Sequence, residues 1–182
     1  MKTRFVQIVF TLVVTILGAA LQDMLPSFGG TKPPVLLAMT LSLVFSEPEA
    51  DMRDRRTAAP FFANGWIPMA LLAGAFEDAL SGFPTGCAVG FIVLAGATAR
   101  LFRSMARFYP PLVCGLVATM AAAPCHELWL CMWGVVGNAP SGFVRFFASA
   151  LPAAPTGALI FMLMPWLARI TGFHGVATGR FA

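Results

Sequence analysis

Two short polar groups interrupt long apolar stretches of the sequence, and each carries side chains that could do acid–base or metal chemistry. Glu77 and Asp78 are adjacent carboxylates near the end of one stretch, and His126 and Glu127 lie within another, next to Cys125. An acidic residue at the centre of a bilayer costs roughly 2.5 to 3.5 kcal/mol, so such residues commonly mark function when they lie deep. The candidate chemistry is therefore a proton relay, metal binding or a buried ion pair.

Neither group matches a known catalytic or metal-binding motif. Neighbouring residues of a helix point about 100° apart, and an HExxH zinc motif is absent because residue 130 is Leu. The sequence also lacks a Gly-x-Ser-x-Gly nucleophile motif and the glycine-rich fingerprints of nucleotide sites. The cysteines have the spacing of neither a zinc site nor a disulfide framework: Cys87, Cys114, Cys125 and Cys131. We therefore expect no enzymatic activity, no cofactor and no metal site.

The carboxylate pair lies only two or three residues before Leu80, where its apolar stretch ends. We therefore favour an interfacial helix end from which both side chains reach headgroups or water. The alternative is a polar contact with Arg145, with Lys32 or with a partner helix. For His126 and Glu127 we favour an interhelical hydrogen bond or exposure to water over a proton relay or an ion pair with Arg145.

The composition indicates that most of the surface of this chain faces lipid. Of its 182 residues, 58% are hydrophobic and only 11% are charged, and the mean hydropathy is +0.80. Such a chain has too few charged groups to cover its folded surface in water, which excludes a water-soluble domain. The basic residues stand in small groups beside apolar stretches, at 2–4, 53–56 and 100–107. That distribution is typical of membrane topology and excludes a nucleic-acid partner.

Six apolar segments must position these residues, and they predict an all-α integral membrane protein with one polytopic domain over 1–182. The approximate spans are 5–22, 34–46, 58–80, 85–102, 111–134 and 143–168. The first follows two basic residues, as in a signal peptide, but the five later segments favour a retained helix. The second holds about eleven apolar residues, roughly 17 Å of helix. It therefore requires flanking residues, a re-entrant course or burial against its neighbours.

The basic residues also predict the orientation of the six spans. Ten of the twelve Lys and Arg fall on the side of the two termini, whereas Lys32 and Arg145 fall on the other side. The positive-inside rule therefore places the N and C termini in the cytoplasm. The segment 47–56 has seven charged residues in ten positions, so it is expected to be an aqueous loop between the second and third spans.

Glycine and proline shape the connection between the third and fourth segments. Residues 81–84, Ser-Gly-Phe-Pro, predict a helix-terminating turn. Gly86 and Gly90 have the small-xxx-small spacing that allows close contact between helices in lipid. Prolines at 124, 152, 155 and 165 predict kinks in the last two segments.

This hairpin resembles the corresponding part of the MreD family of rod shape-determining membrane proteins. The family tends to show the pattern Gly-Leu-x-x-Asp-x-x-x-Gly-x-Pro-x-Gly, and five residues here fit it: Gly74, Asp78, Gly82, Pro84 and Gly86. The first loop, from Gln22 to Pro33, also looks like the family's polar exit from its first span. Ala75 departs from the pattern where the family favours Leu, and Glu77 stands where Gln is frequent. The C-terminal half carries no motif that matches.

The resemblance implies a non-enzymatic component of the bacterial cytoplasmic membrane that scaffolds lateral peptidoglycan synthesis and rod shape. The implied partners are an MreC-type single-span membrane protein, the cell-wall synthesis machinery and membrane lipid. A fold similar to the substrate-binding components of energy-coupling-factor transporters is implied as well. In this interpretation Glu77, Asp78 and Arg145 make polar or partner contacts, and the packing and turn residues are Gly74, Gly82, Pro84, Gly86 and Gly90.

Two functions of other classes stay open. The proline-broken fifth and sixth spans would suit a pocket, as in the substrate-binding membrane component of a vitamin-type transporter. An intramembrane enzyme would instead require Glu77, Asp78, His126 and Glu127 to converge in a water-filled cavity.

Overall fold

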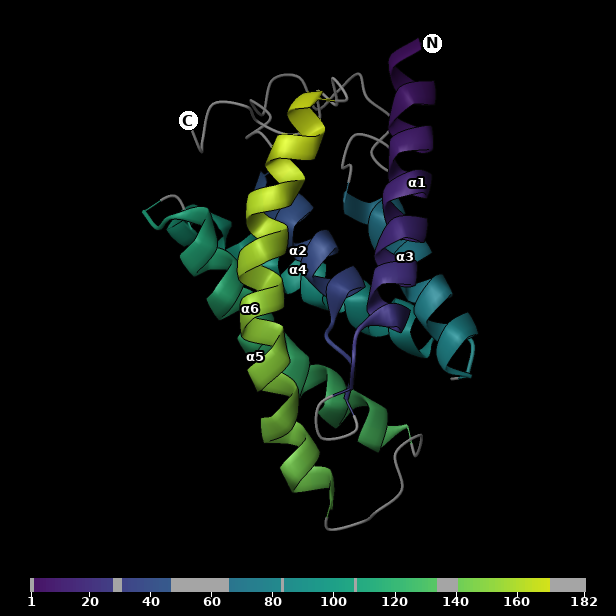
Figure 1. Cartoon of the computed structure of the whole chain (residues 1–182), viewed down its shortest axis with the longest axis vertical. Helices are drawn as coiled ribbons and strands as arrows, with labels where there is room; N and C mark the ends of the chain where they lie inside the picture. Colours follow the sequence, from purple (N-terminus) through teal and green to yellow (C-terminus); the bar gives the residue numbers. More distant parts are fainter. Residues whose placement is uncertain are drawn as a thin grey trace.

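The computed structural model describes residues 2–27, 31–46, 66–82, 84–106, 108–133 and 141–170, with side chains at 8–27, 31–46, 66–82, 84–104, 108–133 and 147–167. Six α-helices make up the elements of these ranges (Figure 1): α1 Lys2–Met24, α2 Val35–Ser46, α3 Trp66–Ser81, α4 Cys87–Ala106, α5 Pro111–Met132 and α6 Ser141–Ile170. The expected all-α fold is therefore confirmed.

The helix bounds follow the hydropathy of the sequence. Five helices begin and end within a few residues of the predicted segments. The third was predicted from residue 58, and residues 58–65 lie outside the described residues. Pro68 stands in the first turn of α3, where a missing N–H removes no helical hydrogen bond. α5 continues as a helix through Pro124, and α6 continues through its three internal prolines.

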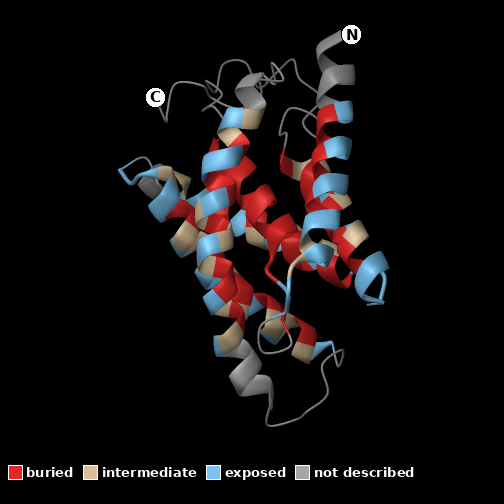
Figure 2. Ribbon diagram, in the orientation of Figure 1, coloured by how far each residue is buried: buried red, intermediate tan, exposed pale blue. Residues whose placement is uncertain are grey.

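The short helix α2 is the centre of the fold. All twelve of its residues are buried, and it contacts each of the other five helices. Figure 2 shows its buried residues between α1 and α6. A helix that is apolar on every side must be enclosed, and twelve residues reach only about 18 Å. Of the three explanations that the sequence allowed for this short segment, burial against its neighbours is the one found.

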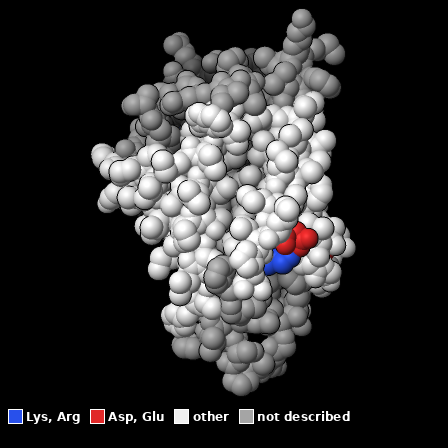
Figure 3. Space-filling view, in the orientation of Figure 1, with Lys and Arg blue, Asp and Glu red and all other residues white. Residues whose placement is uncertain are grey.

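Three helices of the described chain are long and apolar enough to cross a membrane, over Cys87–Ser104, Pro111–Met132 and Phe147–Leu167. Large apolar side chains on these helices point outward, among them Leu101 and Leu151. The face drawn in Figure 3 carries one group of acidic and basic atoms on a described surface that is otherwise uncharged. Apolar surface of this extent requires contact with lipid or protein. These are the features of a membrane protein.

Close contacts at two glycines join the last two helices. A Cβ on Gly157 of α6 or on Gly115 of α5 would overlap the backbone of the other helix. The nearby Thr119 hydroxyl donates to the carbonyl of Gly115 at 2.5 Å and to that of Ala153, across the interface, at 2.8 Å. Small residues with an interhelical hydrogen bond are typical of helix packing in lipid.

Candidate functional site

The side chain of Asp78 holds the hairpin between α3 and α4. Its Oδ2 accepts a hydrogen bond from the Gly86 N–H and its Oδ1 accepts one from the Ala88 N–H, both at 2.7 Å. α4 begins at Cys87, so these donors lie at its N-terminus, where the helix has no acceptors of its own for them. The positive end of the helix dipole also favours a carboxylate here. Asp78 therefore caps α4 from the preceding helix.

Two glycines of the turn take backbone conformations that other residues adopt at a cost. Gly82 has φ 67° and Gly86 has φ 96°. A Cβ added to either would meet nothing within 4 Å, so conformation and not space explains the glycines. Pro84 lies between them, exposed, and its carbonyl accepts the Cys87 N–H at 3.1 Å. The turn predicted at residues 81–84 is found, and in the structure it continues to Gly86.

α3 and α4 approach each other closely at two other glycines. A Cβ on Gly74 would overlap the backbone of Val89, so only a residue without a side chain fits at this contact. A Cβ on Gly96 would lie 2.6 Å from the ring of Trp66. The predicted packing role of Gly74 therefore agrees with its position.

The close helix contact expected at Gly86 and Gly90 is not found there. Gly86 belongs to the turn, because its positive φ precedes the first residue of α4. Gly90 is exposed, and a Cβ on it would lie an ordinary 3.6 Å from Trp129. The small-xxx-small spacing identified a glycine-rich helix start correctly but assigned the packing to the wrong glycines.

Glu77 precedes Asp78 on α3 and faces other helices. Its carboxylate lies close enough to the side chain of Gln22 on α1 to interact with it, and its Oε1 lies 3.8 Å from Nε2 of His126 on α5. Gln22 Oε1 also accepts the Leu36 N–H of α2 at 3.1 Å. The polar cluster formed by Gln22, Glu77 and His126 thus links α1, α3 and α5 and reaches α2.

These ionisable side chains are buried within the protein. The exposed fraction is 9% for Glu77, 6% for Asp78 and 8% for His126. The prediction that the two carboxylates reach headgroups or water is therefore wrong, because neighbouring helices enclose them. The prediction that His126 is exposed to water is wrong for the same reason. An interhelical contact of His126 is found, although at 3.8 Å it is longer than a hydrogen bond.

The basic residues expected near the carboxylates have different positions. Lys32 forms an ion pair with Asp23, and both side chains are exposed. Arg145 belongs to α6, but its side chain falls outside the described residues. A contact between Arg145 and the carboxylates therefore stays a prediction.

Aromatic residues complete the surroundings of His126. The Phe91 ring lies 4.8 Å from the imidazole and 6.3 Å from the Trp129 ring, measured between centroids. Trp129 Nε1 donates to the Cys87 carbonyl at 3.0 Å, which ties α5 to the start of α4. Sequence reasoning did not place Gln22, Phe91 or Trp129 in this site, because none of them belongs to a motif there.

In this site Asp78 binds backbone amides of α4, and the cluster of Gln22, Glu77 and His126 joins three helices. The described residues hold no group of three or more His, Cys, Asp or Glu side chains that could bind a metal ion. Two apolar pockets, one of about 810 Å³ and one of about 680 Å³, are lined by residues other than Glu77, Asp78, His126 and Glu127. No family model matches this chain, and no curated protein or solved structure matches it.

Proposed function

We propose that this chain is a non-enzymatic scaffold of the bacterial cytoplasmic membrane, an MreD-type component of the cell-elongation machinery. It would connect an MreC-type single-span partner with lateral peptidoglycan synthesis and so support rod shape. The observation that carries this proposal is that the five residues that fit the MreD-type pattern all have structural roles in the α3–α4 hairpin. Asp78 caps α4, Gly82, Pro84 and Gly86 shape the turn, and Gly74 admits the neighbouring helix. A motif whose members build a hairpin suits a protein that presents a fixed surface.

The proposal includes six membrane crossings with cytoplasmic termini. α1 begins and α6 ends at the same end of the molecule (Figure 1), as an even number of crossings requires. Ten of the twelve basic residues would lie on that side. A fold similar to the substrate-binding components of energy-coupling-factor transporters is part of the same proposal, and enclosure by five helices would let the short α2 complete its crossing within protein.

The proposed partner contact lies at the hairpin. Because Glu77 and Asp78 are buried, their contribution is to shape the α3–α4 connection. The exposed residues of the turn, Ser81, Gly82 and those from Pro84 to Gly86, form the proposed contact surface. Arg145 remains a proposed polar contact for the partner. Substitutions at the buried carboxylates would then act on the partner through the shape of this turn.

A pull-down of the tagged full-length chain from its native host, in a gentle detergent, tests the function. We expect mass spectrometry to identify a single-span, coiled-coil protein of the cell-wall machinery. The Asp78→Ala variant should lose this partner at equal membrane abundance, whereas Asp23→Ala, which removes an exposed carboxylate, should keep it. Recovery of the partner with both variants would remove Asp78 from the proposal.

The second candidate is the substrate-binding membrane component of a small-molecule transporter. It is favoured by a pocket of about 810 Å³ between helices, a volume within the usual range for ligand sites, about 300–1,000 Å³. Co-purification of an ATPase pair with a coupling membrane subunit would favour this candidate over the scaffold. A vitamin-type molecule released from the purified protein would do the same.

A further inference from the structure

One ring nitrogen of His126, on α5, has no hydrogen-bond partner among the residues that the structure describes. This atom, Nε2, is fully enclosed. A buried polar atom without a partner is rare, because it gives up its hydrogen bond to water and gains none in return. The ionisable group that faces it is the carboxyl of Glu77 on α3, whose Oε1 lies 3.8 Å away. Both residues are more than nine-tenths buried, so two ionisable groups meet in a site away from bulk water.

Side chains make the link between α3 and α5. Over the described residues the backbones of these two helices do not come into contact, and each helix packs against α2 and α4 instead. Glu77 and His126 therefore reach toward each other across the space between the helices. Their separation of 3.8 Å is about 1 Å longer than a hydrogen bond. A small shift of either side chain would close this gap once one of the facing atoms is a donor and the other an acceptor.

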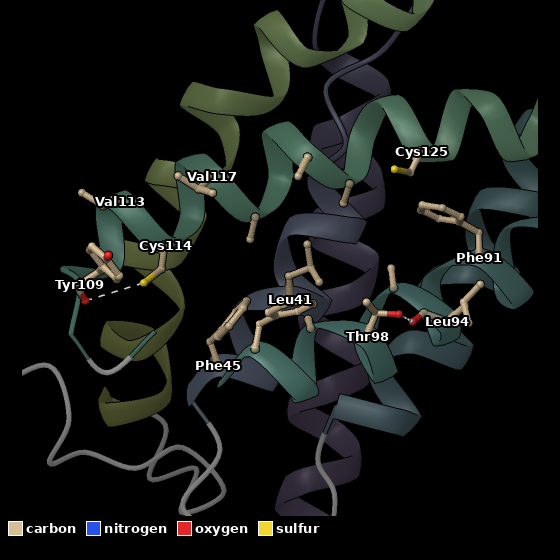
Figure 4. A pocket seen from close by; sticks show the side chains of 16 residues that line it. Leu41, Phe45, Phe91, Leu94, Thr98, Tyr109, Val113, Cys114, Val117 and Cys125 are labelled. Atoms are coloured by element: carbon tan, nitrogen blue, oxygen red, sulfur yellow. Dashed lines mark hydrogen bonds between the residues drawn. The ribbon is translucent and has the colours of Figure 1, made fainter. Parts of the chain in front are cut away.

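An aromatic ring covers one side of the imidazole. The centroid of Phe91, on α4, lies 4.8 Å from that of His126. Phe91 and Cys125 also line an apolar pocket between α4 and α5, and Figure 4 shows the two side chains at the same end of it. His126 follows Cys125 in the chain but does not belong to the lining. The pocket therefore offers Nε2 no partner, and the Glu77 carboxyl is the group in position to satisfy it.

The other ionisable groups near the pair are acids. They are Asp78 of α3, Cys87 of α4 and Glu127 of α5. Helix α2 has no titratable residue, and the described side chains of α6 include none. On α1, Asp23 pairs with Lys32 on the exposed surface. Arg100 and Arg103 lie about 20 Å or more along α4 from its first residue. The described basic side chains therefore lie away from the pair.

The number of protons on the pair decides whether the two facing atoms attract each other. With no proton, Oε1 and Nε2 are both acceptors, and the negative charge of Glu77 lies next to that of Asp78. With two protons, a positive imidazolium is buried beside a carboxyl group that has lost the opposite charge. With one proton, a donor faces an acceptor and the pair has no net charge. Burial favours this single-proton state, because a net charge away from water is costly.

We propose that Glu77 and His126 form a buried proton-binding site, in which one proton held between Oε1 and Nε2 joins α3 to α5. The proton-bound pair is neutral as a whole and satisfies the unpartnered nitrogen. Release of the proton leaves two acceptors facing each other and weakens the link between the α3–α4 hairpin and α5. The site therefore makes the packing of this hairpin sensitive to pH. This inference does not depend on the proposed role in cell elongation, since it follows from the burial, spacing and surroundings of the two side chains.

Folding should take up this proton from water at mildly alkaline pH. In the unfolded chain Glu and His ionise as they do in peptides, so at about pH 8 the two side chains hold almost no proton. The folded pair holds one. The folding equilibrium constant should therefore fall about tenfold per unit of rising pH, until the folded pair also releases its proton. Between about pH 5 and 6 the unfolded chain carries one proton as well, on His, so the pair contributes no slope there.

The apparent melting temperature of the full-length protein, measured in one non-ionic detergent from about pH 6 to about pH 9, tests this dependence. The wild-type value should fall as the pH rises. Glu77→Gln should lose most of that fall, because its amide N–H donates to Nε2 without a bound proton. Asp23→Asn changes an exposed carboxylate in the same way, so it is the matched control and should fall like the wild type. The same fall in all three proteins would overturn the proposal.

Spectroscopy of the folded protein gives a second test that needs no change in the pair. At about pH 8 the proton must be on the carboxyl or on the imidazole, whereas exposed carboxyl and imidazole groups are unprotonated. The protein should therefore show either the infrared carbonyl band of a carboxylic acid or the nitrogen-15 signals of an imidazolium. His174→Gln leaves His126 as the single histidine, which assigns the nitrogen signals. Absence of both signals would overturn the proposal.

Discussion

The carboxylate of Asp78 on α3 accepts a hydrogen bond from the backbone N–H of Ala88 on α4 at 2.7 Å. The same carboxylate accepts the Gly86 N–H, so one side chain satisfies two donors at the start of α4. Asp78 is almost fully enclosed, and water could not easily replace it at either donor. One acidic residue of the hairpin therefore fixes where α4 begins and how it is joined to α3.

Asp78→Ala should lower the free energy of unfolding by about 2 kcal/mol, because a helix cap is lost and two amide donors lose a charged acceptor. Asp78→Asn keeps one acceptor oxygen and should fall between the wild type and Asp78→Ala. The measurement is the apparent melting temperature of the full-length protein in one detergent at a fixed scan rate, since thermal unfolding of such proteins is commonly irreversible.

The control for this prediction is Asp23→Ala. Asp23 pairs with Lys32 on the exposed surface, and pairs of this kind contribute less than about 1 kcal/mol. Its melting temperature should stay close to that of the wild type. If the melting temperature of Asp78→Ala were the same as that of Asp23→Ala, the Asp78 cap would contribute nothing to stability.

Gly74→Ala should destabilise the protein by about 1–3 kcal/mol, because its new methyl group would overlap the Val89 backbone and force α3 away from α4. Gly90→Ala is the matched comparison, since its methyl group would make an ordinary 3.6 Å contact with Trp129. It should be neutral or stabilising by up to about 1 kcal/mol through helix propensity. Melting temperatures in the reverse order would mean that the helices approach at Gly90 after all.

The hydropathy of the sequence was sufficient to predict most of the fold. Apolar segments and the polar gaps between them predict five of the six described helices to within a few residues, because each of these helices coincides with an apolar run. The length of α2 left its course open, since twelve residues allow several solutions and only its five neighbours decide among them. Local pattern therefore predicts the elements, whereas their enclosure depends on contacts between distant segments.

The site could be predicted only in part, for the same physical reason. Glu77 and Asp78 lie near the end of their apolar segment, which suggested that their side chains reach water or lipid headgroups. In the structure the chain turns back after α3, and the first turn of α4 covers Asp78. The meeting of Glu77 with Gln22 and His126 brings together three helices, and no spacing within one segment encodes it. Gly82 was predictable as a turn residue because its requirement for positive φ is local, whereas Gly86 was assigned to helix packing and its positive φ was not predicted.

The same substitution at the two turn glycines should have different costs in stability, because their backbone φ angles differ. Gly82, with φ 67°, lies in the left-handed region that Asn tolerates, so Gly82→Asn should cost less than about 1 kcal/mol. Gly86, with φ 96°, lies beyond that region, so Gly86→Asn should cost about 1–3 kcal/mol. Both residues are exposed, and a Cβ at either meets open space, so the difference in melting temperature would report the backbone alone. Equal costs would contradict this account of the turn.

Glu77 offers a prediction that separates the scaffold proposal from a proton pathway through the buried carboxylate. Glu77→Gln removes the charge but keeps the volume and a polar partner for Gln22 and His126. It should therefore fold and, in the scaffold proposal, restore rod shape in cells that lack the wild-type chain. Glu77→Ala leaves the two neighbours facing an empty space and should be less stable by about 1–3 kcal/mol. Cell width and membrane abundance, measured together, distinguish a lost function from a lost protein.

The outcome for Glu77→Gln depends on whether the acidic group itself is used. A carboxylate that relays protons cannot be replaced by an amide, because an amide neither gains nor loses a proton near neutral pH. A carboxylate that only joins α1, α3 and α5 can be replaced, since an amide of the same size can still make polar contacts with the neighbouring Gln22 side chain. Normal shape with Glu77→Gln would therefore support the scaffold, in keeping with the frequent Gln at this place in the family that the hairpin resembles. Loss of shape at wild-type abundance and melting temperature would instead move Glu77 and His126 into a proton pathway.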